Sequence, residues 1–170
     1  MQLLTFSVAG QPYAIESRRV IEVLPLVAAR PLPQAPDYLL GIFTYRGRLM
    51  PLVDLARRLG VAPPPARLST RVIVVEIDPG SAADPGDRTA PLRLGLVAEN
   101  VVAVRSADEA GATLPPLRLP GADYLDRALR IGGETVQLID VRKLLPAELT
   151  AGLTAGLTAG LAAAAAKVGP

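Results

Sequence analysis

Short apolar runs separated by closely spaced turn residues dominate this sequence and limit what it can fold into. Leu4, Phe6 and Val8 alternate with polar residues, as in a strand buried on one face. Residues 71–77 are rich in β-branched side chains, which is typical of a strand buried on both faces. Four prolines between positions 25 and 36 exclude a long helix there. The chain is therefore predicted to hold about nine or ten short strands in an all-β sandwich or barrel.

The sequence contains no histidine and no cysteine. This excludes a Ser-His-Asp triad, a cysteine nucleophile, an imidazole base and any metal site built from thiolates or imidazoles. Glycine-rich phosphate loops and the HExxH motif of zinc proteases are also missing from the sequence. No convergent group of carboxylates, lysines or tyrosines suggests an active site of another kind. We therefore expect a protein that is not an enzyme and uses no metal and no cofactor.

Two stretches, 45–55 and 131–141, repeat the same plan 86 positions apart. Each reads as a strand, a tight turn, a second strand and an Asp before a short helix. Such a repeat predicts two similar β-lobes, which should pack together because neither is large enough for a robust core of its own. Asp54 and Asp140 are predicted to be helix N-caps. They lack the Asp-Thr/Ser-Gly turn that an aspartic-protease dyad uses.

The repeat also singles out Arg46. The corresponding position of the second stretch is Gly132, a residue suited to a tight turn, so turn geometry does not explain an arginine. A side chain on a loop held by two strands is well placed to reach a carboxylate or a backbone carbonyl of a partner. The alternative is an arginine that is simply solvated at the surface.

The charge balance is mild, with 18 basic and 16 acidic residues. Because only Lys143 and Lys167 are lysines, the positive charge is almost entirely arginine. An Arg-rich β-barrel that binds nucleic acid is therefore an alternative. Such a protein would concentrate its basic residues and interleave aromatic ones, whereas the arginines here are spread along the chain beside only two Phe and four Tyr.

The C-terminal residues 147–170 form a low-complexity tail after a domain predicted to span 1–146, in which 78–91 form a surface loop. The tail repeats Thr-Ala-Gly-Leu three times before a run of alanines, and these residues contribute too little transfer energy to favour a membrane span. A helical tail would align four leucines in one stripe that lies on the domain or on a partner: Leu149, Leu153, Leu157 and Leu161. We expect removal of 150–170 to leave fold and function intact.

The segment 41–55 reads Gly, two apolar residues, Thr-Tyr, Arg-Gly, then a strand containing Pro and ending in Asp-Leu. It resembles the signature of the CheW-like domain family, and the resemblance extends over nearly all of 1–146. It implies two packed five-stranded SH3-like β-barrels with short capping helices, followed here by a helical or flexible tail.

The same resemblance implies a non-catalytic chemosensory adaptor that stands alone, without a kinase segment. Its partners would be the cytoplasmic tip of methyl-accepting chemoreceptors and the regulatory domain of a CheA-type histidine kinase, with no nucleic acid and no membrane insertion. It would be cytoplasmic and recruited to receptor arrays at the inner face of the membrane. Positions that match partner contacts of the family are Val20, Glu22, Gly41, Arg46, Gly47, Val72 and Ile73. Val20 and Gly41 also fit simple core and turn roles.

Some residues depart from the family pattern. Thr44-Tyr45 replaces the usual Asn and aliphatic residue before Arg-Gly, and 24–27 and 68–71 differ from the flagellar version. These segments are more similar to adaptors of surface-sensing, Wsp-like systems that control cyclic-di-GMP. The departures bear on which receptor and kinase are bound and leave the predicted adaptor role unchanged.

Overall fold

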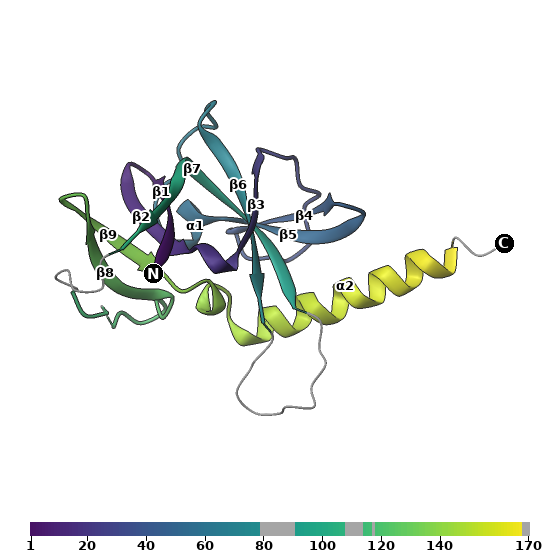
Figure 1. Cartoon of the computed structure of the whole chain (residues 1–170). Helices are drawn as coiled ribbons and strands as arrows, with labels where there is room; N and C mark the ends of the chain where they lie inside the picture. The colour runs from purple at the N-terminus through teal and green to yellow at the C-terminus, as the bar shows by residue number, and fades with distance from the viewer. Residues whose placement is uncertain (79–90, 108–113, 117, 168–170) are drawn as a thin grey trace.

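Nine strands and one long C-terminal helix make up most of the chain that the structure describes (Figure 1). The computed structural model describes residues 1–78, 91–107, 114–116 and 118–167, with side chains described in these ranges except at 103 and 158–167. The mostly β fold predicted from the turn spacing is confirmed. The loop predicted at 78–91 lies almost wholly outside the described residues.

The elements follow the predicted order of short apolar runs and turns. The strands are β1 (Gln2–Val8), β2 (Gln11–Glu16), β3 (Val20–Pro25), β4 (Leu39–Tyr45), β5 (Arg48–Asp54), β6 (Thr70–Ile77), β7 (Leu92–Ser106), β8 (Leu125–Ile131) and β9 (Glu134–Ile139). The helical segments are η1 (Ser17–Arg19), α1 (Leu55–Arg58), η2 (Val141–Lys143) and α2 (Ala147–Lys167). Every helical segment before α2 is a single turn, as the prolines and turn residues require.

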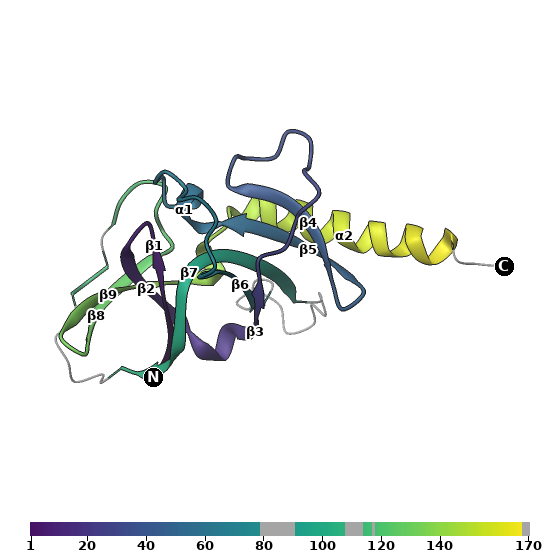
Figure 2. The same cartoon turned by 90° about the horizontal axis from the view of Figure 1, so that it is seen from above.

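Strand β7 is 15 residues long and joins two groups of strands (Figure 2). Its beginning pairs antiparallel with β6 from Leu92 to Glu99 and parallel with β5. Its end pairs antiparallel with β1, from Glu99 to Ser106. We call β3, β4, β5, β6 and the beginning of β7 the first lobe. The second lobe consists of β1, β2, β8, β9 and the end of β7.

The two lobes repeat one pairing plan, which confirms the repeat seen in the sequence. Hairpin β4–β5 pairs in parallel with β7, and hairpin β8–β9 pairs in parallel with β2. Asp54 donates its backbone N–H to the carbonyl of Tyr38 at 2.8 Å, and Asp140 does the same to Tyr124 at 2.8 Å. Isolated bridges also join β4 to Arg30 and β8 to the segment at 114. The pairing agrees with two five-stranded barrels, whose closure stays a prediction.

Both predicted N-caps are confirmed. A side-chain oxygen of Asp54 accepts the backbone N–H of Ala56 at 3.0 Å at the start of α1. A side-chain oxygen of Asp140 accepts the backbone N–H of Arg142 at 3.0 Å at the start of η2. Each bond satisfies a donor that the helical turn leaves without a partner.

One hydrophobic core spans both lobes. The main buried cluster contains Phe6 and Ile15 of the second lobe together with Val53, Ile73 and Leu96 of the first. Smaller clusters lie inside each lobe. The lobes are therefore held together by apolar burial, as their small size requires.

Arg58 adds a polar clasp between the lobes. Its guanidinium lies 5.1 Å from the ring centre of Tyr38, just before β4, and 4.4 Å from that of Tyr124, just before β8. Its Nε donates to the carbonyl oxygen of Leu144 at 2.5 Å. Cation–π contacts of this kind contribute about 0.5–2 kcal/mol each.

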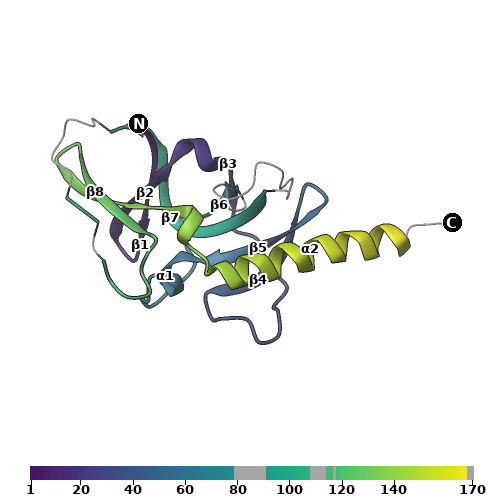
Figure 3. The ribbon, with the colours of Figure 1, turned by 90° about the horizontal axis from the view of Figure 1, so that it is seen from below.

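The C-terminal helix α2 is part of the packed structure. Figure 3 shows it beside β5, with its C-terminal half extending away from the lobes. Leu149, Leu153 and Leu157 pack against the main core cluster. Of the two places predicted for the leucine stripe, the structure shows the domain. Burial of Leu153 and Leu157 there removes apolar surface from water and argues against a dispensable tail. Among the described helices, none is long and apolar enough to cross a membrane.

Truncation tests this packing. Removing 158–170 is expected to leave the free energy of unfolding nearly unchanged. Removing 150–170 is expected to lower it by about 2 kcal/mol, because two half-buried leucines are lost and core surface is exposed. Urea denaturation of the two truncated chains measures the difference. Equal stabilities would contradict the docking of α2.

The Asp140 cap predicts a specific response to acid. Burial raises the pKa of Asp140, but the side-chain and backbone hydrogen bonds of Arg142 outweigh burial, so the pKa lies below the usual value. Because the folded pKa is lowered, the charged form stabilises the fold fully above about pH 4 and its contribution is lost as pH falls through the folded pKa.

Replacing Asp140 separates the cap from the charge. Asp140→Ala is expected to cost about 1 kcal/mol at neutral pH, while Asp140→Asn keeps an acceptor and costs less. The difference between the wild type and Asp140→Asn should shrink between pH 4 and pH 2 in urea denaturation. A difference that does not change with pH would show that the Asp140 charge contributes nothing.

Candidate partner-binding site

The turn between β4 and β5 brings Arg46 to the side chain of Glu22 on β3. Nη2 of Arg46 donates to Oε2 of Glu22 at 2.9 Å. The Arg46 side chain is 72% exposed, so this ion pair faces solvent. Two of the residues predicted to contact a partner, 24 positions apart in the sequence, therefore form one charged unit.

Tyr45 completes this unit. Its hydroxyl donates to the same Oε2 of Glu22, and its ring centre lies 5.2 Å from the Arg46 guanidinium. The bond to Glu22 is the main cause that raises the pKa of Tyr45, and burial adds to it. The phenol therefore remains a donor at neutral pH. We call Glu22, Tyr45 and Arg46 the Arg46 cluster.

Tyr45 was not among the predicted site residues. Thr44-Tyr45 differed from the family pattern, and this difference was its only signal in the sequence. The contact with Glu22 depends on the spatial pairing of β4 with a distant strand, which no local pattern reveals.

The backbone at the turn has no need of an arginine. Arg46 and Gly47 have φ angles of 49° and 76°, and the matching Gly132 and Gly133 have 59° and 82°. Both turns thus use two successive left-handed residues, a conformation that favours glycine. Holding a non-glycine residue there costs about 1 kcal/mol. The arginine is therefore explained by its side chain and not by the turn.

Strand β3 lies at one end of the sheet and, within the described part of the chain, pairs with β6 alone. From Glu22 onward its side chains alternate, so Glu22 lies on one face and Val23, which is 38% exposed, lies on the other. Ile21, at the irregular pairing between Val20 and Glu22, is also 38% exposed. An edge strand with charge on one face and accessible apolar side chains on the other is suited to protein contacts.

Gly41 and Val20 have structural roles. Gly41 has a φ of 142°, and a Cβ atom there would lie 2.0 Å from the carbonyl oxygen of Arg30. Arg30 and Ile42 exchange two backbone hydrogen bonds of 2.8 and 2.9 Å at this point, so the close approach is part of the fold. Val20 is half-buried against the main core. The core and turn interpretation accounts for both residues.

Val72 and Ile73 were predicted to contact a partner, and the structure places them elsewhere. Neither side chain has exposed surface. Val72 belongs to the cluster inside the first lobe, and Ile73 to the core that both lobes share. The expectation of direct side-chain contact is therefore corrected, because β6 lies between two paired strands and its side chains are covered on both faces.

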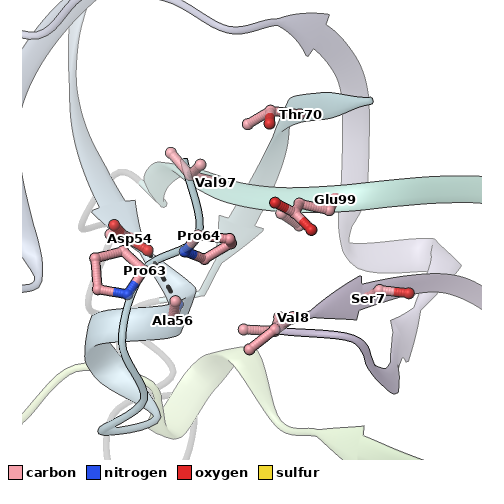
Figure 4. Close-up of a pocket in the computed structure, with 11 residues that line it drawn as sticks. Ser7, Val8, Asp54, Ala56, Pro63, Pro64, Thr70, Val97 and Glu99 are labelled. Carbon is pink, nitrogen blue, oxygen red and sulfur yellow. Dashed lines mark hydrogen bonds between the residues drawn. The ribbon is translucent and has the colours of Figure 1, made fainter. Parts of the chain in front are cut away.

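A small hollow opens where α1 approaches β1, β6 and β7 (Figure 4). Its volume is about 40 Å³, enough for a water molecule or two. Asp54 and Glu99 are the acidic groups that line it, and Asp54 already caps α1. Among the described residues no group of three metal-ligating side chains occurs. The hollow therefore offers no site for a cofactor-sized ligand.

Gly41→Ala tests the close backbone approach. The added Cβ overlaps the Arg30 carbonyl, so the free energy of unfolding is expected to fall by about 3 kcal/mol or more. Gly10→Ala is the matched control, because Gly10 also has a positive φ of 78° but has open space around it. Its expected cost is about 1 kcal/mol. Equal losses in urea denaturation would contradict the packing role of Gly41.

The comparisons with known proteins agree with one another. The model of the CheW-like domain matches residues 2–149. Protein FrzA of Myxococcus xanthus is 28% identical over 147 residues, which cover 85% of this chain and 84% of that protein. Chemotaxis protein CheW of Treponema pallidum is 22% identical over 153 residues, covering 86% and 83%. The crystal structure of the scaffolding protein TtCheW from Thermoanaerobacter tengcongensis shares the fold, with a TM-score of 0.69 and 24% identity over 84% of this chain and 90% of that one.

Proposed function

The chain belongs to the CheW-like domain family, and we propose that it is a non-catalytic chemotaxis scaffold that couples methyl-accepting receptors to a CheA-type histidine kinase. The observation that carries this proposal is the family match over residues 2–149, which contains the signature at 41–55. Relatives that align over most of their length with this chain are named chemotaxis proteins. Scaffolding needs surfaces and no catalytic groups, which suits a chain without histidine or cysteine.

The Arg46 cluster and the exposed face of β3 support this function physically. Charged groups at the rim of an interface select the partner and speed association, while apolar area supplies most of the affinity. Our proposed partner contacts are Glu22, Arg46 and Gly47, the neighbour of Arg46 in the same turn. The kinase regulatory domain and the receptor tip are the proposed partners, met at the inner face of the membrane.

The pathway is a finer proposal. We infer a surface-sensing, Wsp-like system from the departures at 44–45, 24–27 and 68–71. Copurification with a receptor and hybrid kinase of such a system would support it. Selective binding to a flagellar kinase and its receptors would contradict it.

Reversing the charge of Arg46 tests the site. Arg46→Glu places a carboxylate beside Glu22, so binding to a receptor tip or kinase is expected to weaken at least about tenfold, with the fold retained. The measurement is receptor-dependent autophosphorylation of the kinase in reconstituted membranes, with partner affinities by titration and folding by circular dichroism.

Arg130→Glu is the matched control for this charge reversal. Arg130 lies near the equivalent turn of the second lobe, where it donates to the carbonyl of Gly133 at 3.4 Å. It makes the same change in net charge and is expected to leave coupling intact. Normal coupling by Arg46→Glu would exclude Arg46 as a contact, and failure of the wild type to bind either partner would refute the scaffold function.

A further inference from the structure

The Arg46 cluster is present in one lobe only. Strand β3 in the first lobe and the end of β7 in the second hold equivalent places. Strand β3 pairs antiparallel with β6, and the end of β7 pairs antiparallel with β1. The stretch of β7 that pairs with β1 near the place of Glu22, residues 101–104, carries no acidic side chain. In the hairpins Tyr45 corresponds to Ile131 and Arg46 to Gly132. The second lobe thus keeps the backbone plan without any of the three polar groups.

The second lobe shows which part of the Tyr45 side chain the packing of the strand end requires. Tyr45 and Ile131 end corresponding strands, and each is 7% exposed. An aliphatic side chain therefore satisfies the packing at this position. The hydroxyl and the aromatic face of Tyr45 exceed what the fold needs at the end of the strand.

Those two additional features act on Glu22 and Arg46 together. An exposed ion pair between flexible side chains is worth little and adopts many geometries. Here the Tyr45 hydroxyl binds the Oε2 that also accepts Arg46, and the ring lies beside the guanidinium. Because the Tyr45 side chain is buried at a strand end, it restricts the orientation of both charged groups. Preorganisation of this kind lowers the entropy lost on binding.

The hydrogen-bonding groups that Glu22 and Arg46 have left define which partner groups the cluster can bind. Both bonds described for Glu22 use Oε2, so Oε1 offers an acceptor to a donor on the partner. Arg46 uses Nη2 and keeps further N–H donors on an exposed guanidinium. A segment that carries a cation and a carboxylate side by side complements this arrangement.

We propose that Tyr45 is a positioning residue that sets partner selectivity by holding Glu22 and Arg46 as one preformed unit for a paired cation and carboxylate on the partner. The proposal rests on the scaffold function proposed above and deepens it. Tyr45 acts through Glu22 and Arg46, and its hydroxyl is engaged within the cluster.

Three variants of Tyr45 and Glu22 test the proposal. Tyr45→Phe keeps the ring beside Arg46 and loses the bond to Glu22, so affinity for the partner at this face should fall about three- to tenfold. Tyr45→Ile copies the second lobe, loses both contacts and should bind more weakly still. In a Glu22→Ala background, Tyr45→Phe should cause no further loss. Binding is measured separately for a receptor tip and a kinase regulatory domain.

The control is Tyr124→Phe, which removes a hydroxyl bonded to the Arg58 carbonyl at 3.2 Å in the clasp between the lobes. It is expected to lower stability without changing either affinity. If Tyr45→Phe and Tyr45→Ile bind each partner with the same affinity as the wild type, the role of Tyr45 is overturned while the scaffold function stands. An equal effect of Tyr45→Phe with and without Glu22 would also overturn it, since that marks a merely structural residue. A wild type that binds neither partner would refute the scaffold function, and this inference with it.

Discussion

The long strand β7 is the element on which the rest of the structure depends. It supplies backbone hydrogen bonds to β6 and β5 at its beginning and to β1 at its end. Two small sets of strands thereby share one ladder and one apolar core, which neither could build alone. The Arg58 clasp and the docked leucines of α2 add to this union from the outside.

The shared architecture makes the difference between the lobes informative. Both hairpins use the same left-handed turn, so the second lobe shows what the fold requires at each position. Glycine and an aliphatic residue satisfy that requirement at Gly132 and Ile131. Where the first lobe has Arg46 and Tyr45 instead, the additional groups meet Glu22 at the edge of the sheet. The two lobes therefore share one backbone arrangement, and the Arg46 cluster distinguishes the surface of the first lobe from that of the second.

Local features of the fold were predictable because they depend on near neighbours. The turn at Arg46, the N-caps at Asp54 and Asp140 and the repeated hairpins follow from patterns within a few residues. The site was predicted in part: Glu22 and Arg46 were named, and their contact was not. The family resemblance named Val72 and Ile73 as partner contacts, although the β-branched run at 71–77 indicated a buried strand, and both side chains are buried. The leucine stripe of α2 was predicted to lie on the domain or on a partner, and the sequence alone did not decide between the two, because the stripe fits both equally well.

The sequence by itself determined the chemistry available to this protein: no imidazole or thiol, short strands, two matching hairpins and an arginine at a turn that favours glycine. Only the tertiary structure decided which of these groups meet. Glu22 and Tyr45 are 23 positions apart, and Arg58 reaches Leu144 across 86. Such contacts arise from strand pairing and shared burial, which are properties of the whole fold and not of any segment.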